Sequence, residues 1–206
     1  MEGRSEQISL VEVSYIFVLM RYVNLLTQTQ EEIIMAKSAE ELFELGLKYH
    51  DGNGVPQDSK KALDLYRQSA EQGYDQAQYV LGLYYKDDLA DIPNTRIDLQ
   101  KSAEWLKKSA EQNHSGGQFH LALAYRNGDG VPKDDKKAIE LCHKAAAQGH
   151  DYAQFILGLY YSGGLKGMDN AHNNTAKAID WLKKSAAQGN EEAKAELEKL
   201  KGKKGK

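Results

Sequence analysis

The residues best suited to chemistry in this 206-residue chain are one cysteine and six histidines. Cys142 and His143 are adjacent, so on a helix their side chains point about 100° apart, whereas a metal site needs a different spacing. His114 and His150 each follow a residue that favours the end of a helix, which predicts that they lie in turns. We therefore expect neither a metal site nor a bound cofactor.

The loop at residues 51–54 has the sequence Asp-Gly-Asn-Gly. It has no glutamate at the twelfth position from Asp51, which a calcium loop requires, and no strand precedes it, as a phosphate-binding loop requires. No serine occupies a Gly-x-Ser-x-Gly turn, which exposes the nucleophile of many hydrolases. The sequence therefore predicts that the chain is not an enzyme.

The charge of the chain is nearly balanced, with 27 Lys and Arg against 30 Asp and Glu and a net charge of −3. This balance provides no broad positive field, so we do not expect nucleic acid as a partner. A single cysteine cannot form an intramolecular disulfide, and a lone thiol fits a reducing interior. The composition therefore favours a cytoplasmic protein.

The most apolar stretch, residues 8–26, is the one candidate for a signal or membrane anchor. Glu12 and Arg21 interrupt it and leave eight uncharged residues, 13–20, whereas a membrane-spanning helix needs about 20. No Ala-x-Ala cleavage site follows, which argues against a secretory signal. We expect no association with a membrane.

The elements that position these residues repeat along the chain. The pattern Leu-x-Leu-x-Tyr occurs at residues 45–49, 81–85, 121–125 and 157–161, with steps of 36, 40 and 36. A second pattern, Ser/Ala-Ala-x-Gln-Gly/Asn, occurs at residues 69–73, 109–113, 145–149 and 185–189. The alternating step predicts four repeats that arose by duplication of a pair.

Each repeat is predicted to contain two helices. In the first helix Ala77, Leu81 and Tyr85 share a core face, and Gly82 beside them permits close approach of a neighbouring helix. The second helix follows an N-cap residue and ends at a residue that tolerates left-handed backbone. The N-caps are Asp58, Asp98, Asp134 and Asn174, and the ending residues are Gly73, Asn113, Gly149 and Gly189.

The inner face of the second helix is predicted from the same periodicity. In the first repeat it holds Ala62, Leu65 and Ser69, whose small members mark tight crossings. At the position of Leu65 the later repeats have Trp105, Leu141 and Trp181.

Taken together, these motifs closely resemble the Sel1-like repeat, a relative of the tetratricopeptide repeat. The resemblance rests on Leu-Gly-x-x-Tyr, on the turn at residues 51–58 and its equivalent at 127–134, and on Ala-Glu-Gln-Gly at residues 70–73. It covers residues 39–193. It implies an all-α fold, an α/α right-handed superhelix (solenoid) of four Sel1-like helix-turn-helix repeats with a C-terminal capping helix, which serves as a scaffold or adaptor in protein complexes.

The repeats are expected at residues 39–74, 75–114, 115–150 and 151–190. Residues 191–206 are expected to form the capping helix and a basic tail, and residues 1–38 an N-terminal helical cap or extension. Such a cap would bury Tyr15, Phe17, Leu19 and Val23. Alternatively, translation starts at Met35 and the preceding residues do not belong to the protein. The loops of repeats 2 and 4 are four residues longer than the others, through drift or for contact with a partner.

The far side of the first helices is the candidate binding surface, because in the tetratricopeptide fold this stripe lines the concave groove. Its residues are Phe43, Glu44, Leu47, His50, Tyr79, Val80, Leu83, Lys86, Phe119, His120, Leu123, Arg126, Phe155, Ile156 and Leu159. Alternatively, the aromatic residues and leucines pack against the next repeat. Specificity would then lie with the positions that differ between repeats, such as His50, Lys86 and Arg126.

We therefore expect a monomeric protein that binds another protein or peptide in this groove. A more specific version is an immunity-type inhibitor of a toxin. The alternative from another class, a hydrolase of cell-wall or β-lactam substrates, lacks a nucleophile and base in the sequence.

Overall fold

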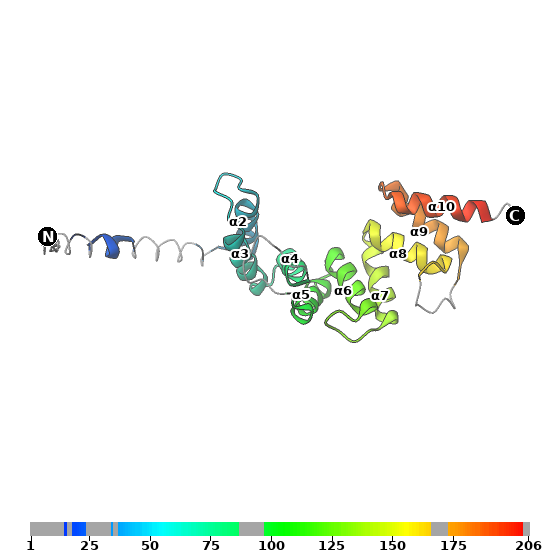
Figure 1. Ribbon diagram of the computed structural model, residues 1–206, viewed down its shortest axis with the longest axis horizontal. Coiled ribbons are helices and arrows are strands. Elements are labelled where there is room, and N and C mark those ends of the chain that lie inside the picture. Colours follow the sequence, from blue (N-terminus) through cyan, green and yellow to red (C-terminus); the bar gives the residue numbers. More distant parts are fainter. Residues whose placement is uncertain are drawn as a thin grey trace, which may run out of the picture.

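The computed structural model describes residues 15, 18–23, 34, 37–86, 97–165 and 173–203. Within these ranges the helices of known extent are labelled α2 to α10, and no strand occurs (Figure 1). They are α2 (Ala39–Asp51), α3 (Ser59–Glu71), α4 (Asp75–Lys86), α5 (Leu99–Glu111), α6 (Ser115–Asn127), α7 (Asp135–Ala147), α8 (Asp151–Ser162), α9 (Thr175–Ala187) and α10 (Glu191–Lys203).

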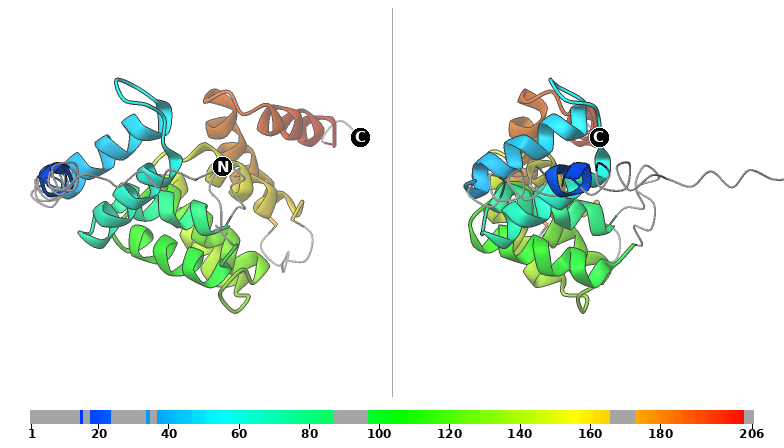
Figure 2. Two further views of the ribbon diagram at one scale, coloured as in Figure 1. Left: turned by 60° about the vertical axis from the view of Figure 1, so that its left-hand side comes forward. Right: turned by 90° about the vertical axis from the view of Figure 1, so that its left-hand side faces the viewer.

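The helices stack in chain order. Each second helix packs against the first helix of its own repeat and the first helix of the next, so that α5, for example, lies between α4 and α6. The first helices also touch one another, α4 with α6 and α8 with α10. The stack curves, and α2 and α10 lie on the same side of it (Figure 2). The fold is the expected α/α right-handed superhelix with a C-terminal capping helix.

The helix starts follow the predicted N-caps. The side chains of Asp58, Asp98 and Asp134 accept hydrogen bonds from backbone amides three residues later at 2.9, 3.0 and 3.0 Å. Asn174 does the same at 3.0 Å. Each side chain satisfies an amide that the helix itself leaves without a partner, so these four predictions are confirmed.

The helix ends also follow the sequence. Gly73, Gly149 and Gly189 have φ values of 99°, 94° and 97°. Asn113, at φ 69°, is the one residue other than glycine with a positive φ among the described residues. Glycine and asparagine tolerate this backbone most readily, which explains the predicted stop signal.

The predicted close approach at Gly82 is confirmed. A Cβ atom there would lie 2.6 Å from Cγ of Leu106, and one at Gly158 would lie 2.5 Å from Cγ of Leu182. In the third repeat Ala122 replaces the glycine, and the opposing residue is the smaller Cys142, with both in one buried cluster. The lone cysteine is therefore a packing residue that makes room for a methyl group.

The predicted inner face of the second helix is confirmed in the first repeat, where Ala62, Leu65 and Ser69 are 0, 2 and 0% exposed, but not at the position of Leu65 in the later repeats. Tyr66, Leu106, Cys142 and Leu182 are 2, 1, 2 and 0% exposed, whereas Trp105, Leu141 and Trp181 at the preceding position are only partly buried. Each second helix is enclosed by two first helices rather than one, which turns its buried face toward the later position.

The expected burial of the N-terminal side chains is wrong for those that can be placed. Tyr15, Leu19 and Val23 are exposed rather than buried, and Phe17 lies outside the described residues. Met35 and most of the two long loops, residues 87–96 and 166–172, also lie outside them, as does the tail after Lys203. Among the described residues of these loops, Leu165 is buried against Ala138 of α7.

Candidate functional site

The candidate groove residues lie on α2, α4, α6 and α8, the first helices of the four repeats. Their aromatic members sit at the joints between repeats. The ring centroids of Phe43 and Tyr74 lie 5.3 Å apart, and those of Tyr79 and His114 lie 4.9 Å apart. Phe119 stacks on His150 at 4.5 Å. Contacts of this kind stabilise packing, so the aromatic rings join one repeat to the next.

The two histidines at these joints have a second role that the sequence did not reveal. Nδ1 of His114 accepts a hydrogen bond from the Gly117 amide at 3.0 Å, and Nδ1 of His150 accepts one from the Ala153 amide at 3.3 Å. Each histidine is therefore the N-cap of its helix. Burial lowers the pKa of both imidazoles below the usual value, which favours the neutral form that a cap acceptor needs.

The aliphatic members of the stripe are also used in packing. Leu47 and Val80 pack against the cluster that contains Phe43 and Leu81. Leu123 and Ile156 pack against the cluster of Phe119 and Leu157, and Leu159 packs against Ala138 and Leu165. Leu83 and His120 are partly buried.

The polar members remain for contact with solvent. Glu44 and His50 are exposed on α2, and Lys86 and Arg126 are partly exposed in the last turns of α4 and α6. Neither basic side chain forms an ion pair with any of the described residues. Each of the two central repeats therefore has a partly exposed basic side chain in the last turn of its first helix.

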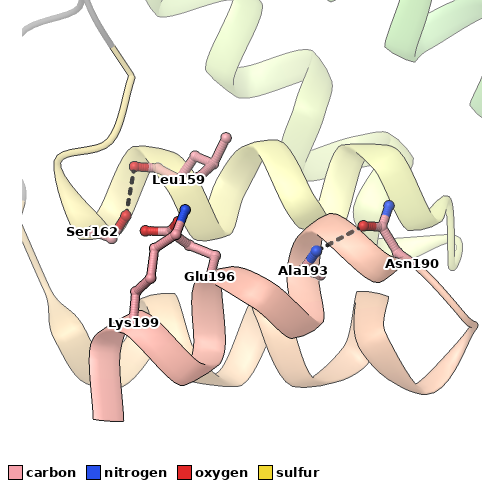
Figure 3. A network of polar contacts seen from close by, with 6 residues as sticks. All are labelled: Leu159, Ser162, Asn190, Ala193, Glu196 and Lys199. Carbon is pink, nitrogen blue, oxygen red and sulfur yellow. Dashed lines mark hydrogen bonds and ion pairs between the residues drawn. The ribbon is translucent and has the colours of Figure 1, made fainter. Parts of the chain in front are cut away.

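The capping helix, α10, packs against α8 and α9, the two helices of the fourth repeat. Figure 3 shows Glu196 and its ion-pair partner Lys199, at 2.9 Å, on α10 beside Leu159 and Ser162 of α8. The start of α10 is fixed by Asn190, which accepts a hydrogen bond from the Ala193 amide at 2.8 Å (Figure 3). Phe155 of α8 packs against a buried cluster formed by Ala178 and Leu182 of α9 and by Ala193, Leu197 and Leu200 of α10.

A ladder of glutamine amides joins the repeats and was missed in the sequence. Gln78 is buried in α4, donates to the Ala70 carbonyl at 3.2 Å and accepts from Gln112 at 2.8 Å. The same links recur in the next two repeats. Gln148 donates to Gln118 at 2.8 Å, and Gln188 donates to Gln154 at 3.0 Å. The recurrence of glutamine at equivalent positions of the repeats was the feature of the sequence that could have indicated this ladder. Satisfied buried amides fix the geometry between repeats.

The residues suited to chemistry are not brought together. Within the described part of the chain no group of three or more His, Cys, Asp or Glu is placed to hold a metal ion. Burial raises the pKa of the Cys142 thiol to about 12, and Nε2 of His143 lies 3.1 Å from the hydroxyl of Tyr161. None of the described helices is long and apolar enough to cross a membrane.

Three solved structures resemble the chain. A protective antigen of uropathogenic Escherichia coli strains, c5321, is 36% identical with a TM-score of 0.67, over 77% of this chain and 32% of that chain. A Sel1 repeat protein from Oxalobacter formigenes is 29% identical with a TM-score of 0.65, over 78% and 44%. Immunity protein Pa5087 from Pseudomonas aeruginosa is 24% identical with a TM-score of 0.50, over 79% and 57%, a likeness of fold alone.

The chain spans less than half the length of the first two of these proteins, 32 and 44%. No curated protein matches it significantly. The model of the Sel1 repeat, in contrast, matches four times, at residues 42–74, 75–114, 115–150 and 151–190. Because these matches cover most of the sequence, the chain belongs to the Sel1 repeat family.

Proposed function

We propose that this chain is a protein-interaction scaffold that binds a partner protein or peptide along the side formed by its first helices. Sel1 repeat proteins are generally protein-interaction scaffolds. The supporting observation is that packed and solvent-exposed residues alternate among the candidate residues of the first helices. The aromatic and aliphatic residues join the repeats, whereas Glu44, His50, Lys86 and Arg126 reach solvent from a rigid frame.

The charges on this side favour an acidic partner segment. Lys86 and Arg126 lie at equivalent positions of neighbouring repeats, in the last turn of α4 and of α6. Complementary charges of this kind accelerate association and set the register of a bound segment. Because the frame is held by packing and amide ladders, little conformational entropy is lost on binding.

The test begins with purification of the chain and its bound partners from the native host, followed by titration of the identified partner. We expect Lys86→Glu with Arg126→Glu to weaken binding and to reduce its salt dependence, while helicity and melting stay nearly unchanged. The matched control is Lys60→Glu with Lys183→Glu, which makes the same change of charge at exposed positions of α3 and α9. Equal affinities for the two double variants would show that this side is not the binding site.

The alternatives have less support. The likeness to an immunity protein shows the fold alone, so an inhibitory role is tested by the neighbouring gene and by direct inhibition of its product. A hydrolase needs an accessible nucleophile beside a base, and Cys142 is buried with its thiol pKa raised to about 12.

A further inference from the structure

A second feature lies at the seams between consecutive second helices, where residues of the intervening first helix form part of the wall. In the later repeats the side chain at the position of Leu65 packs toward the preceding second helix. Trp105 of α5 packs against the cluster of Ala70 and Leu81. Trp181 of α9 packs against the cluster of Ala146 and Leu157. Two seams, α3–α5 and α7–α9, are therefore filled by an indole ring.

Each of these tryptophans is covered by a lysine three residues later. Nζ of Lys108 lies 3.9 Å from the ring centroid of Trp105, and Nζ of Lys184 lies 4.2 Å from that of Trp181. A cation over an indole face is the strongest form of the cation–π interaction. The fold thus builds the same small assembly twice, an indole ring between an apolar floor and a lysine.

The middle seam, between α5 and α7, has the floor without the ring. Leu141 stands at the tryptophan position, and a pocket of about 230 Å³ lies beside it. Its wall includes Ala110 and Leu121. By repeat position these residues correspond to Ala70 and Leu81 at Trp105, and to Ala146 and Leu157 at Trp181.

The lysine of the assembly is also present. Lys144 follows Leu141 by three residues and lines the pocket, as Lys108 and Lys184 follow their tryptophans. Its side chain makes no ion pair, hydrogen bond or ring contact with another described residue. The cation is therefore in place and has no ring beneath it.

We propose that this pocket receives an aromatic side chain, with an indole ring as the best fit, from an acidic segment of a partner protein. The site is distinct from the groove on the first helices. Its rim carries Lys107, Lys137 and Lys144 against Glu111 and Glu140. Lys107 pairs with Glu111 at 3.9 Å and Lys137 with Asp134 at 3.4 Å, which leaves Lys144 as the rim lysine without an ion-pair partner among the described residues. Drug-sized ligands occupy pockets of about 300–1,000 Å³, whereas about 150 Å³ admits benzene. The volume suits one ring.

The test uses a defined probe, a five-residue acidic peptide with a central 5-fluorotryptophan, titrated with the full chain and followed by ¹⁹F NMR. We expect a saturable shift of the fluorine resonance. Leu141→Trp supplies the missing ring from within the chain and should weaken binding about tenfold or more, equivalent to about 1.4 kcal/mol. Lys144→Gln should also weaken it, without filling the pocket. The matched control, Ile97→Trp, adds an indole at an exposed position before α5 and should leave binding unchanged.

Several results would overturn the assignment. They are equal binding by the wild type and Leu141→Trp, equal binding of a peptide with leucine at the centre, and equally tight binding of free 5-fluoroindole, which would indicate a small-molecule site. Sedimentation that shows a dimer dissociated by Leu141→Trp would assign the pocket to a second copy of this chain. Loss of peptide binding in the Lys86→Glu, Arg126→Glu variant alone would place the peptide in the groove, which would refute this inference and leave the proposed function standing.

Discussion

Two equivalent glycines provide a quantitative test of how the repeats are joined. Gly54 and Gly130 occupy the same position in the turns of repeats 1 and 3, with φ values of 74° and 70°. A Cβ atom at Gly54 would meet nothing within 4 Å. One at Gly130 would overlap the backbone carbonyl of Leu99 and lie 2.7 Å from the amide nitrogen of Gln100, at the start of α5. The third turn thus rests on the preceding repeat.

The expected effects of alanine follow from this difference. Both substitutions place a side chain in left-handed backbone, at a cost of about 1–2 kcal/mol, partly offset by about 0.4–1 kcal/mol from restriction of the unfolded chain. Gly130→Ala adds a clash between two backbones that no rotamer change relieves. Overpacking of this kind costs about 1–3 kcal/mol. At about 2–4 °C per kcal/mol for a chain of this size, the melting temperature should fall by a further 2–12 °C or so.

The assay is thermal and urea unfolding of both variants, followed by circular dichroism at 222 nm, with hydrogen exchange of the α5 amides as a local readout. Exchange at the start of α5 should accelerate in Gly130→Ala and stay unchanged in Gly54→Ala. Equal losses of stability in the two variants would show that the turn at Gly130 makes no close contact with α5.

Two further predictions concern packing and pH. Gly158→Leu should lower the free energy of unfolding by on the order of 1–3 kcal/mol or more, because it overpacks the helix crossing. The control Gly202→Leu places its side chain in open space and should leave unfolding by urea unchanged. An unchanged stability of Gly158→Leu would show that close helix packing does not require this glycine. Because the pKa values of His114 and His150 are lowered in the folded state, the unfolded chain binds more protons between those values and about 6.5, so stability should fall as pH drops below about 6.5. Asparagine is a good N-cap, so replacement of both histidines by asparagine should reduce the pH dependence of the urea midpoint between pH 7.5 and 5. Some pH dependence should remain from His143, whose pKa burial also lowers. An undiminished pH dependence would contradict the capping role of His114 and His150.

Local signals in the sequence determined the repeat architecture. The caps at Asp58, Asp98, Asp134 and Asn174 and the left-handed residues that end the second helices depend on hydrogen bonds within a few residues. Such features can be predicted without knowledge of distant contacts. The missing side chains at Gly82 and Gly158 likewise indicated a close approach, although not the residue that makes it.

Only the tertiary structure decided what the remaining side chains do. The stripe from Phe43 to Leu159 has one sequence pattern, but its rings pack at the joints and its charges reach solvent, because each first helix contacts the helices of two repeats. The sequence shows single differences between the repeats: Ala122 in place of glycine, Cys142 in place of leucine, and Leu141 in place of tryptophan. Their structural effect can be seen only when the opposing residues are known. A smaller side chain either fits a larger residue opposite it or leaves an open pocket.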